Sequence, residues 1–486
     1  MWRRGYAGAV IVVGVMLGFA LGCPAHADGG PCDAPAGPAQ YPDKFDWSGG
    51  SYLLGDLQGV RNKATEAGVT LCSQYNLYAY DNARGGLKRG VDAQGQLFSW
   101  IDIDLGKFSR VDALSDTFAH AGYYSLQGRS ITPREVGSFS SVSFFEALST
   151  NRLGTAWIER RFFDGKLSLR AGQLGMDDEF FLAPTGSAFL NSTFGFPSWT
   201  GTVLPGGGAA YSLQGPGTRV KYSPTDSVTL MAGAFTGDPA GRSNAVPQLA
   251  NRYGTTFNLN GGTLWIGEAA YSTAYANSGV ALPGTYKIGA WFETRHDFNA
   301  LRFDTIGLSL ADPASSGRPK RYGNDFGVYG IVDQTLFSGE KDGVHKLSGF
   351  LRLGASPSDR NLVDLYLDGG LTFTGPIPGR PTDLVGIGMA YDRISNAARS
   401  RDRDARAFAA LASTPALGAS QLAPVRDQEV MIEALYTITI TPWCTLDLDV
   451  QHVFHPSGHV LATSGRNIGK VVKDATLIGL NTQIKF

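Results

Sequence analysis

Three histidines near the end of the chain are the first residues whose spacing suggests chemistry. His452, His455 and His459 follow one another closely, and imidazole nitrogens are common ligands of zinc. However, His452 and His455 are three residues apart in an alternating segment, so they point to opposite faces of a strand. His459 comes only after a Pro-Ser-Gly turn. The sequence therefore predicts no metal site here, and nothing else in it calls for a cofactor.

The motifs of hydrolases and of nucleotide-binding enzymes bear on whether the protein is an enzyme. The sequence contains no G-x-S-x-G motif. The segment "GRNIGKV" has only three residues between its glycines and a valine after its lysine, which does not fit a phosphate-binding loop. We therefore expect a protein that is not an enzyme.

Arginines and carboxylates on the polar faces of alternating segments are the remaining candidates for a site. The basic ones belong to neighbouring segments before residue 225, and they are Arg161, Arg170, Arg219 and Lys221. The acidic ones belong to segments after residue 360, and they are Asp364, Asp368, Glu433, Asp447 and Asp449. Arg352, between Leu351 and Leu353, is a further candidate.

The elements that carry these residues alternate with a period of two. In "CTLDLDVQHVF", Leu446, Leu448 and Val450 oppose Asp447 and Asp449. Such alternation over about ten residues is typical of strands with one apolar and one polar face. We count sixteen such segments between residues 69 and 486. Connections after even-numbered segments are short, whereas long ones (175–207, 237–261, 295–321 and 393–427) follow odd-numbered segments.

The first residues predict export from the cytoplasm. "MWRR" is followed by an apolar stretch and by Ala25-His26-Ala27, which is the pattern of a signal peptide (1–27) cleaved near Ala27. A lipoprotein anchored through Cys23 is the competing interpretation. No later apolar run reaches the length of a spanning helix. The formal net charge of −1 excludes nucleic acid as a partner.

An exported chain with sixteen alternating strands and no spanning helix is best explained as a transmembrane barrel. Single-chain bacterial barrels have an even number of antiparallel strands, short periplasmic turns and long outer loops. The sequence therefore predicts an all-β, 16-stranded antiparallel β-barrel over residues 69–486, in contact with outer-membrane lipid. Closure of the barrel would place the last strand, which ends at Phe486, beside the first.

The lead between signal peptide and barrel (28–68) is expected in the periplasm. Leu53, Leu57, Val60 and Ala64 recur at helical spacing, so the segment is predicted to contain a short helix. Cys72 and Cys444 are expected two strand spacings apart, too far for a disulfide. Cys32 in the lead could instead pair with Cys72.

Blocks along nearly the whole mature chain resemble the carbohydrate-selective porin (OprB) family of outer-membrane sugar porins. They include "WIDIDLGKF", "KLSLRAGQLGMDDEFF", "FLNSTFGFP", "GGLTFTGPIPGRPTD" and "DVQHVFHPSGH". The resemblance implies facilitated diffusion of monosaccharides such as glucose across a Gram-negative outer membrane. It leaves open an organic-acid channel, for example for quinate, or a barrel enzyme, and either a monomer or a homotrimer.

Within such a barrel, selectivity depends on the constriction and on the groups that line it. We predict that the long segment 175–207 folds into the lumen and contributes Asp177, Asp178, Glu179 and Phe180 to the constriction. An outer loop that caps the mouth is the alternative. The basic and acidic candidates would then face one another across the pore and orient a hydroxyl-rich solute.

Overall fold

The computed structural model describes residues 50–241, 246–277, 280–295, 297–339, 345–411, 423–463 and 467–486. The predicted signal peptide, most of the predicted lead and Cys32 lie outside the described residues. No described helix is long and apolar enough to cross a membrane.

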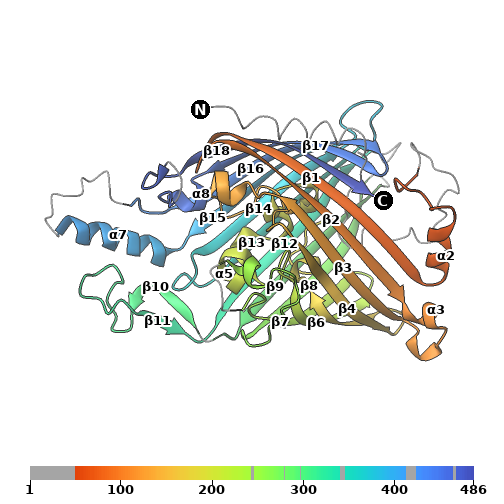
Figure 1. Ribbon diagram of the computed structural model, residues 1–486, viewed down its shortest axis with the longest axis horizontal. Coiled ribbons are helices and arrows are strands. Elements are labelled where there is room, and N and C mark those ends of the chain that lie inside the picture. Colours follow the sequence, from red (N-terminus) through yellow and green to blue (C-terminus); the bar gives the residue numbers. More distant parts are fainter. Residues whose placement is uncertain are drawn as a thin grey trace, which may run out of the picture.

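Sixteen antiparallel strands form one closed barrel in the described part of the chain (Figure 1). In chain order they are β1 (Val69–Gly86), β2 (Gly90–Asp104), β3 (Thr117–Gly128), β4 (Thr150–Phe162), β5 (Leu167–Leu174), β6 (Gly215–Thr225), β7 (Val228–Thr236), β8 (Thr263–Asn277), β9 (Val280–Glu293), β12 (Asp325–Ser338), β13 (Lys346–Ala355), β14 (Val363–Thr374), β15 (Leu384–Ile394), β16 (Gln428–Thr441), β17 (Cys444–Phe454) and β18 (Lys473–Lys485). The predicted fold class is confirmed.

The two ends of the sheet meet between β1 and β18. Tyr80 lies opposite Gly479 in this pair, and a Cβ atom on Gly479 would be only 2.0 Å from the Tyr80 ring. The absent side chain therefore makes room for an aromatic ring on the partner strand. The Phe486 amide donates a hydrogen bond to the Ser73 carbonyl at 2.8 Å, so pairing continues to the last residue.

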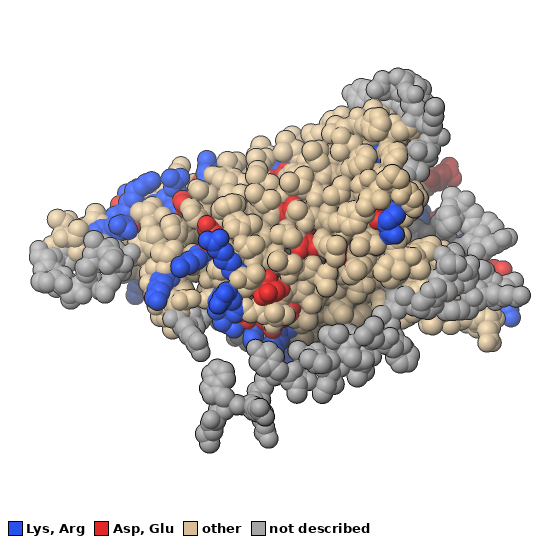
Figure 2. Space-filling view, turned by 90° about the horizontal axis from the view of Figure 1, so that it is seen from above, with Lys and Arg blue, Asp and Glu red and all other residues tan. Residues whose placement is uncertain are grey.

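Successive residues of each strand face opposite sides of the barrel wall, as the alternation predicts. Leu351 and Leu353 are 52% and 48% exposed, whereas Arg352 between them is 1% exposed. Apolar side chains thus face the membrane and polar ones face the lumen. Figure 2 shows mostly uncharged residues over the middle of the barrel, with Lys and Arg gathered toward one end.

The two ends of the barrel differ, and we name them by their connections. At the turn end, β4 and β5 are joined by residues 163–166 and β16 and β17 by residues 442–443. The loop end carries the long connections, among them α7 (Asn396–Leu411) and the hairpin β10 (Phe298–Asp304) and β11 (Pro319–Tyr322), which project together in Figure 1. Residues 295–321 were predicted only as a long connection, and this hairpin was not expected.

One short helical segment precedes β1, and the others lie between the strands. They are α2 (Val60–Glu66), α3 (Leu105–Ser109), η1 (Asp112–Leu114), η2 (Thr132–Val136), η3 (Met176–Asp178), η4 (Gly186–Ala188), α4 (Ser192–Gly195), α5 (Ser198–Val203), η5 (Pro205–Gly207), α6 (Pro247–Ala250) and α8 (Pro456–His459). Most of them sit in the connections of the loop end, and η3, η4, α4, α5 and η5 all belong to the segment between β5 and β6.

The helix of the lead is shorter than its apolar spacing suggests. It begins only at Val60, because Leu57, Gln58 and Gly59 have φ values of 51°, 61° and 86°. These left-handed conformations interrupt a right-handed helix. Leu57 and Val60 are 46% and 61% exposed, so this helix does not bury the apolar face that the spacing indicated.

The cysteine predictions are resolved in part. Cys72 is disulfide-bonded, and Cys444 is not its partner. The prediction that Cys32 pairs with Cys72 concerns a residue outside the described part of the chain.

Candidate functional site

The connection between β5 and β6 runs through the inside of the barrel, as the sequence analysis expects for 175–207. We call residues 175–214 the inner loop. Its backbone amides are held by carboxylates on the lumen wall. Glu433 of β16 accepts hydrogen bonds from the Leu190 and Asn191 amides at 2.7 and 2.9 Å. Asp333 of β12 accepts one from the Thr185 amide at 2.7 Å.

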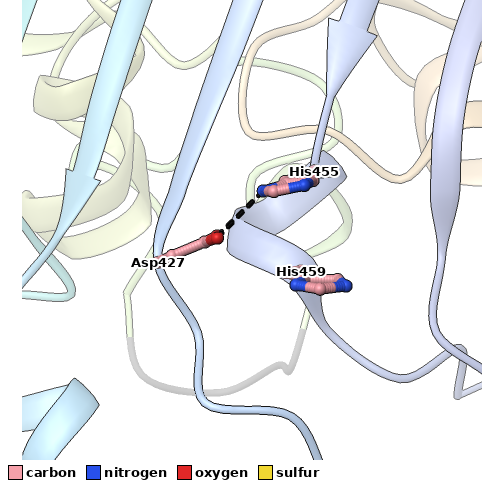
Figure 3. A group of neighbouring side chains, drawn as sticks. All are labelled: Asp427, His455 and His459. Carbon is pink, nitrogen blue, oxygen red and sulfur yellow. Dashed lines mark hydrogen bonds and ion pairs between the residues drawn. The ribbon is translucent and has the colours of Figure 1, made fainter.

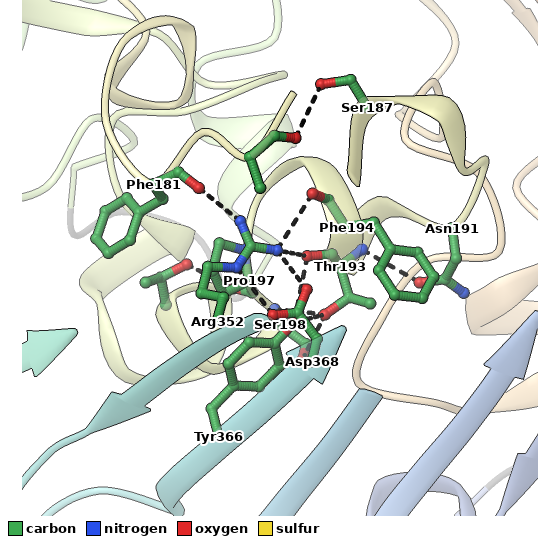
Figure 4. Close-up of polar contacts among 12 residues, drawn as sticks. Phe181, Ser187, Asn191, Thr193, Phe194, Pro197, Ser198, Arg352, Tyr366 and Asp368 are labelled. Atoms are coloured by element: carbon green, nitrogen blue, oxygen red, sulfur yellow. Dashed lines mark hydrogen bonds and ion pairs between the residues drawn. The ribbon is translucent and has the colours of Figure 1, made fainter. Parts of the chain in front are cut away.

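Arg352 is the central attachment of this loop to β13 (Figure 4). Its guanidinium donates to the carbonyls of Phe181 and Thr193 at 2.6 and 2.7 Å and to that of Phe194 at 3.2 Å. It also pairs with Asp368 of β14, and both side chains are almost fully buried. A single arginine therefore joins separate parts of the loop to the wall.

Aromatic rings of the inner loop fill spaces above glycines of the wall. Phe189 lies over Gly370, Gly386 and Gly388, and Trp199 lies over Gly354. Phe180, which the sequence analysis placed in the constriction, is fully buried and packs against Phe235 of β7. Its ring has no surface open to the lumen, so it packs the loop and is not available for stacking on a solute.

A second connection also enters the barrel, and the sequence analysis did not predict this. Residues 129–149, between β3 and β4, cover part of the inner loop and the wall behind it. The Phe144 amide donates to the Leu190 carbonyl at 3.0 Å, and Gln451 of β17 donates to the Val142 carbonyl at 2.8 Å. Glu146 of this connection is buried, and desolvation raises its pKa to about 8.

These two connections together cover the predicted acidic wall. All five carboxylates are at most 5% exposed, and they are Asp364, Asp368, Glu433, Asp447 and Asp449. Each is engaged within the protein: Asp364 with Arg393, and Asp449 with the Tyr80 hydroxyl. Buried in this way, neither they nor Arg352 face the open lumen. Glu433 and the Arg352–Asp368 pair anchor the inner loop, whereas Asp364, Asp447 and Asp449 are engaged by residues of the barrel wall.

The basic candidates lie on the opposite wall, where Arg219 is 3% exposed but the Arg161 side chain is 48% exposed. Glu159, Arg170 and Arg219 are direct neighbours across β4, β5 and β6. Glu159 pairs with Arg170 at 2.6 Å and with Arg219 at 3.2 Å, and with Arg161 on its own strand at 2.8 Å. Glu179 of the inner loop approaches the same group, 2.9 Å from Arg170. We call these five residues the arginine cluster.

The arginine cluster is open to the lumen on one side. The Arg161 side chain is 48% exposed and that of Arg170 is 19% exposed. Arg170 lies 3.9 Å above the Trp157 ring, and His120 stacks on the other face of that ring. Three guanidiniums thus share two carboxylates, and Arg161 and Arg170 offer charged hydrogen-bond donors, while Arg170 and His120 occupy the Trp157 ring.

The remaining predicted residues lie around this cluster. Lys221 of β6 is half-buried, with its strand position next to Ser168 of β5. Asp177 accepts a hydrogen bond from the Tyr211 amide at 2.8 Å, and desolvation raises its pKa to about 6. Asp178 accepts one from the Gly175 amide at 3.2 Å. Both aspartates therefore help to shape the start of the inner loop.

A cavity of about 540 Å³ opens at the loop end of the barrel. Its lining comes from the end of the inner loop and from the connections after β7 and β9. The polar side chains of the lining are Thr202, Asp238, Arg295, Asp297 and Asn299. Arg295 pairs with Asp238 at 2.7 Å. Its volume is within the range of small-molecule pockets.

Comparison with known proteins connects this geometry to a family. The profile described as "Carbohydrate-selective porin, OprB family" matches residues 88–486. The chain belongs to this family. OprB-family porins are β-barrels of the Gram-negative outer membrane. The family match and the closed barrel both point to a channel and not to an enzyme.

Individual relatives agree with this assignment. Porin B of Pseudomonas aeruginosa is 24% identical over 84% of this chain and 87% of that protein. The putative porin QuiX of Acinetobacter baylyi is 24% identical over 90% of this chain and 93% of that protein. The structure of Pseudomonas putida OprB at high pH superposes with a TM-score of 0.77 at 22% identity, over 91% of this chain and all of that chain. The last comparison establishes the shared fold.

Some members of the site were missed from sequence although a signal was available. Glu159 is two residues before Arg161, so strand alternation puts both on the same face of β4. Trp157, two residues before Glu159, lies on the same face of β4 for the same reason. His120 of β3 becomes their neighbour only through the pairing of β3 with β4, where it lies opposite Trp157. Cross-strand neighbours of this kind depend on register, which the alternation of a single segment does not determine.

Proposed function

We propose that this porin is a passive channel for monosaccharides such as glucose, and that the solute passes the arginine cluster opposite the inner loop. The observation that carries the proposal is the partly exposed group of paired guanidiniums and carboxylates in the arginine cluster. A sugar presents hydroxyls around its edge. These hydroxyls can exchange water for charge-assisted hydrogen bonds to Arg161 and Arg170.

The inner loop supports this pathway by its rigidity. Its amides and carbonyls are tied to buried wall residues, so Glu179 is held beside Arg170 and Arg219. A fixed constriction loses less entropy on binding a solute than a mobile one does. The barrel closes within one chain, so the proposed pathway is complete in a single chain whether the protein is a monomer or a homotrimer.

A second candidate is a channel for small organic acids. It is favoured by the excess of positive charge in the arginine cluster, where three arginines share two carboxylates. The carboxylates of the opposite wall do not offset this excess at the lumen surface because they are buried. Family membership favours sugars, and the experiment below separates the two solutes.

The test is single-channel conductance of the full-length protein in a planar bilayer, titrated with glucose and, separately, with gluconate. Saturable block by glucose, with weak or no block by gluconate, supports the sugar channel. Block by gluconate alone would instead identify the protein as a channel for small organic acids. If neither solute changes the current at concentrations that fill known sugar pores, the proposed pathway is wrong.

Variants of two neighbouring arginines, Arg161 of β4 and Arg170 of β5, locate the site. Arg161→Gln and Arg170→Gln should each weaken glucose block by roughly tenfold, because one charge-assisted hydrogen bond contributes about 1.5 kcal/mol or more. Arg160→Gln is the matched control. Arg160 is next to Arg161 on β4. Because side chains alternate along a strand, it lies on the outer face and contacts the Phe162 ring there. Equal effects of all three variants would place the solute elsewhere.

A further inference from the structure

Three side chains from two connections converge at the loop end of the barrel, away from the arginine cluster (Figure 3). Asp427 directly precedes β16, and His455 and His459 belong to the turn after β17. One oxygen or nitrogen atom of each lies within 4.8 Å of the others. The Asp427 carboxylate is 3.0 Å from Nδ1 of His455, and the two imidazoles stack with centroids 4.5 Å apart.

The turn that presents these histidines has an unusual backbone. His455, Ser457 and His459 have φ values of 48°, 53° and 72°, a conformation that is unfavourable for side chains other than glycine. Strain of this kind persists only where surrounding contacts impose it, and it clusters at functional sites. Here the Ser457 amide donates to Glu429 at 2.6 Å, and the Ser457 hydroxyl donates to the Gly137 carbonyl at 2.7 Å.

The backbone path explains why sequence spacing hid this cluster. Strand alternation applies to His452 and His455 only while the chain remains extended. The left-handed turn brings His459 back over His455, and the Asp427 backbone amide donates to the Gly458 carbonyl at 3.2 Å. That hydrogen bond places the carboxylate of a different connection beside the two rings. The grouping therefore depends on tertiary contacts.

The chemistry of the three donors points to one class of ligand. Imidazole nitrogens combined with a carboxylate bind Zn²⁺ and its first-row neighbours, whereas Ca²⁺ and Mg²⁺ prefer oxygen donors throughout. Ligands of a tetrahedral Zn²⁺ lie about 2.1 Å from the metal and so about 3.4 Å from each other. Separations no larger than 4.8 Å reach this value by small side-chain rotations.

We propose that Asp427, His455 and His459 form a binding site for a divalent transition-metal ion of the Zn²⁺ type. The three side chains supply three ligands, and solvent completes the coordination. His455 and Asp427 are 36% and 30% exposed, so an ion reaches the site from outside the barrel. The bound ion would join the β15–β16 connection to the β17–β18 connection at the channel mouth.

The alternative is an ion-free arrangement in which His455 donates a hydrogen bond to Asp427 and His459 only stacks on it. The two arrangements differ in the role of His459. Its imidazole is a ligand in the metal site, but in the alternative it contributes only ring contact. Metal binding by the chain should thus depend on His459 as strongly as on His455.

The test uses untagged, full-length protein that has been purified in detergent and stripped with a chelator. Co²⁺ is added as a coloured probe and followed by its visible absorption, and Zn²⁺ is then used to displace it. We expect one equivalent of Co²⁺ per chain, displaced by Zn²⁺ but not by Mg²⁺. His459→Ala and Asp427→Asn should each weaken binding by at least about 100-fold, the upper end of the effect of losing even an outer-shell partner.

His452→Ala is the matched control. His452 belongs to β17 and is hydrogen-bonded to Thr476 at 2.9 Å, so its loss should leave Co²⁺ affinity within about twofold of the wild type. Heat-modified mobility on gels verifies that each variant retains its barrel. The proposal is overturned if the wild type binds no Co²⁺, if Mg²⁺ displaces it equally well, or if folded His459→Ala and Asp427→Asn bind Co²⁺ as tightly as the wild type.

Discussion

Replacing Arg352 by methionine tests whether the inner loop is held by its buried arginine. Methionine retains much of the length of the side chain but none of its donors. The change leaves Asp368, which is fully buried, without its ion-pair partner, and it leaves the carbonyls of Phe181 and Thr193 without their donor.

The magnitude follows from the burial of this pair. Removing one partner of a buried ion pair destabilises a protein by about 3–5 kcal/mol. The inner loop can relieve this by moving away and admitting water to Asp368. Even the lower value shifts an equilibrium between docked and undocked loop by on the order of 100-fold. We therefore expect a substantial population of channels with an undocked loop, and a wider constriction.

Two measurements follow this shift. Limited proteolysis of the full-length protein should cleave within residues 175–214 in Arg352→Met much faster than in the wild type. Single-channel recordings should show higher and noisier conductance. Arg352→Met combined with Asp368→Asn should recover part of the protection, because it also removes the unpaired buried charge.

The matched control is Arg393→Met. Arg393 also forms an ion pair with a wall aspartate, Asp364, at 2.9 Å, but its side chain is 36% exposed and the pair lies between β14 and β15. The expected change in loop cleavage is small. Equal protection and equal conductance of Arg352→Met and Arg393→Met would refute the anchoring role of Arg352.

Three further predictions concern other contacts of the structure. Glu433→Gln retains one acceptor for the Leu190 and Asn191 amides, so we expect loop docking to weaken by about 1.5–3 kcal/mol, seen as faster proteolysis; unchanged cleavage would contradict this. Because the pKa of Glu146 is raised to about 8, the folded protein holds this proton more tightly than the unfolded chain. Its stability should therefore fall by about 3 kcal/mol between pH 5 and pH 8 relative to Glu146→Gln, measured as the difference in unfolding midpoints; parallel pH profiles would argue against it. Gly479→Ala should cost about 1–3 kcal/mol of barrel stability by overlap with the Tyr80 ring. Gly267→Ala, where the nearest atom to a new Cβ is 3.8 Å away, should leave the heat-modification midpoint unchanged, and equal midpoints for the two variants would refute the overlap.

Much of the barrel could be predicted from the sequence, because its determinants are local. An alternating segment must place one face toward lipid and one toward the lumen, and a shift by one residue would expose every charge to the membrane. Strands such as β17 and β18 can therefore be predicted one at a time from their own residues. The connections are harder to predict from the sequence. The hairpin β10–β11 and the inward course of residues 129–149 depend on contacts with distant parts of the chain.

The site was predictable in composition but less so in arrangement. Arg161, Arg170 and Arg219 do share one side of the lumen, since alternation and strand order suffice to place them. The acidic candidates also share a side, but their exposure depends on what covers them. Glu433 and Asp368 have the same sequence pattern as an open lumen residue, and only the position of the inner loop shows that they are buried.

The uneven covering of the lumen has a consequence for how such channels diversify. The proposed pathway is lined by residues of β4, β5, β6 and the inner loop, which form one continuous stretch of the chain. The anchors that receive the loop come from later strands, and barrel closure depends on β1 and β18. Recombination or substitution within residues 150–225 can thus alter solute preference while the rest of the barrel is inherited unchanged.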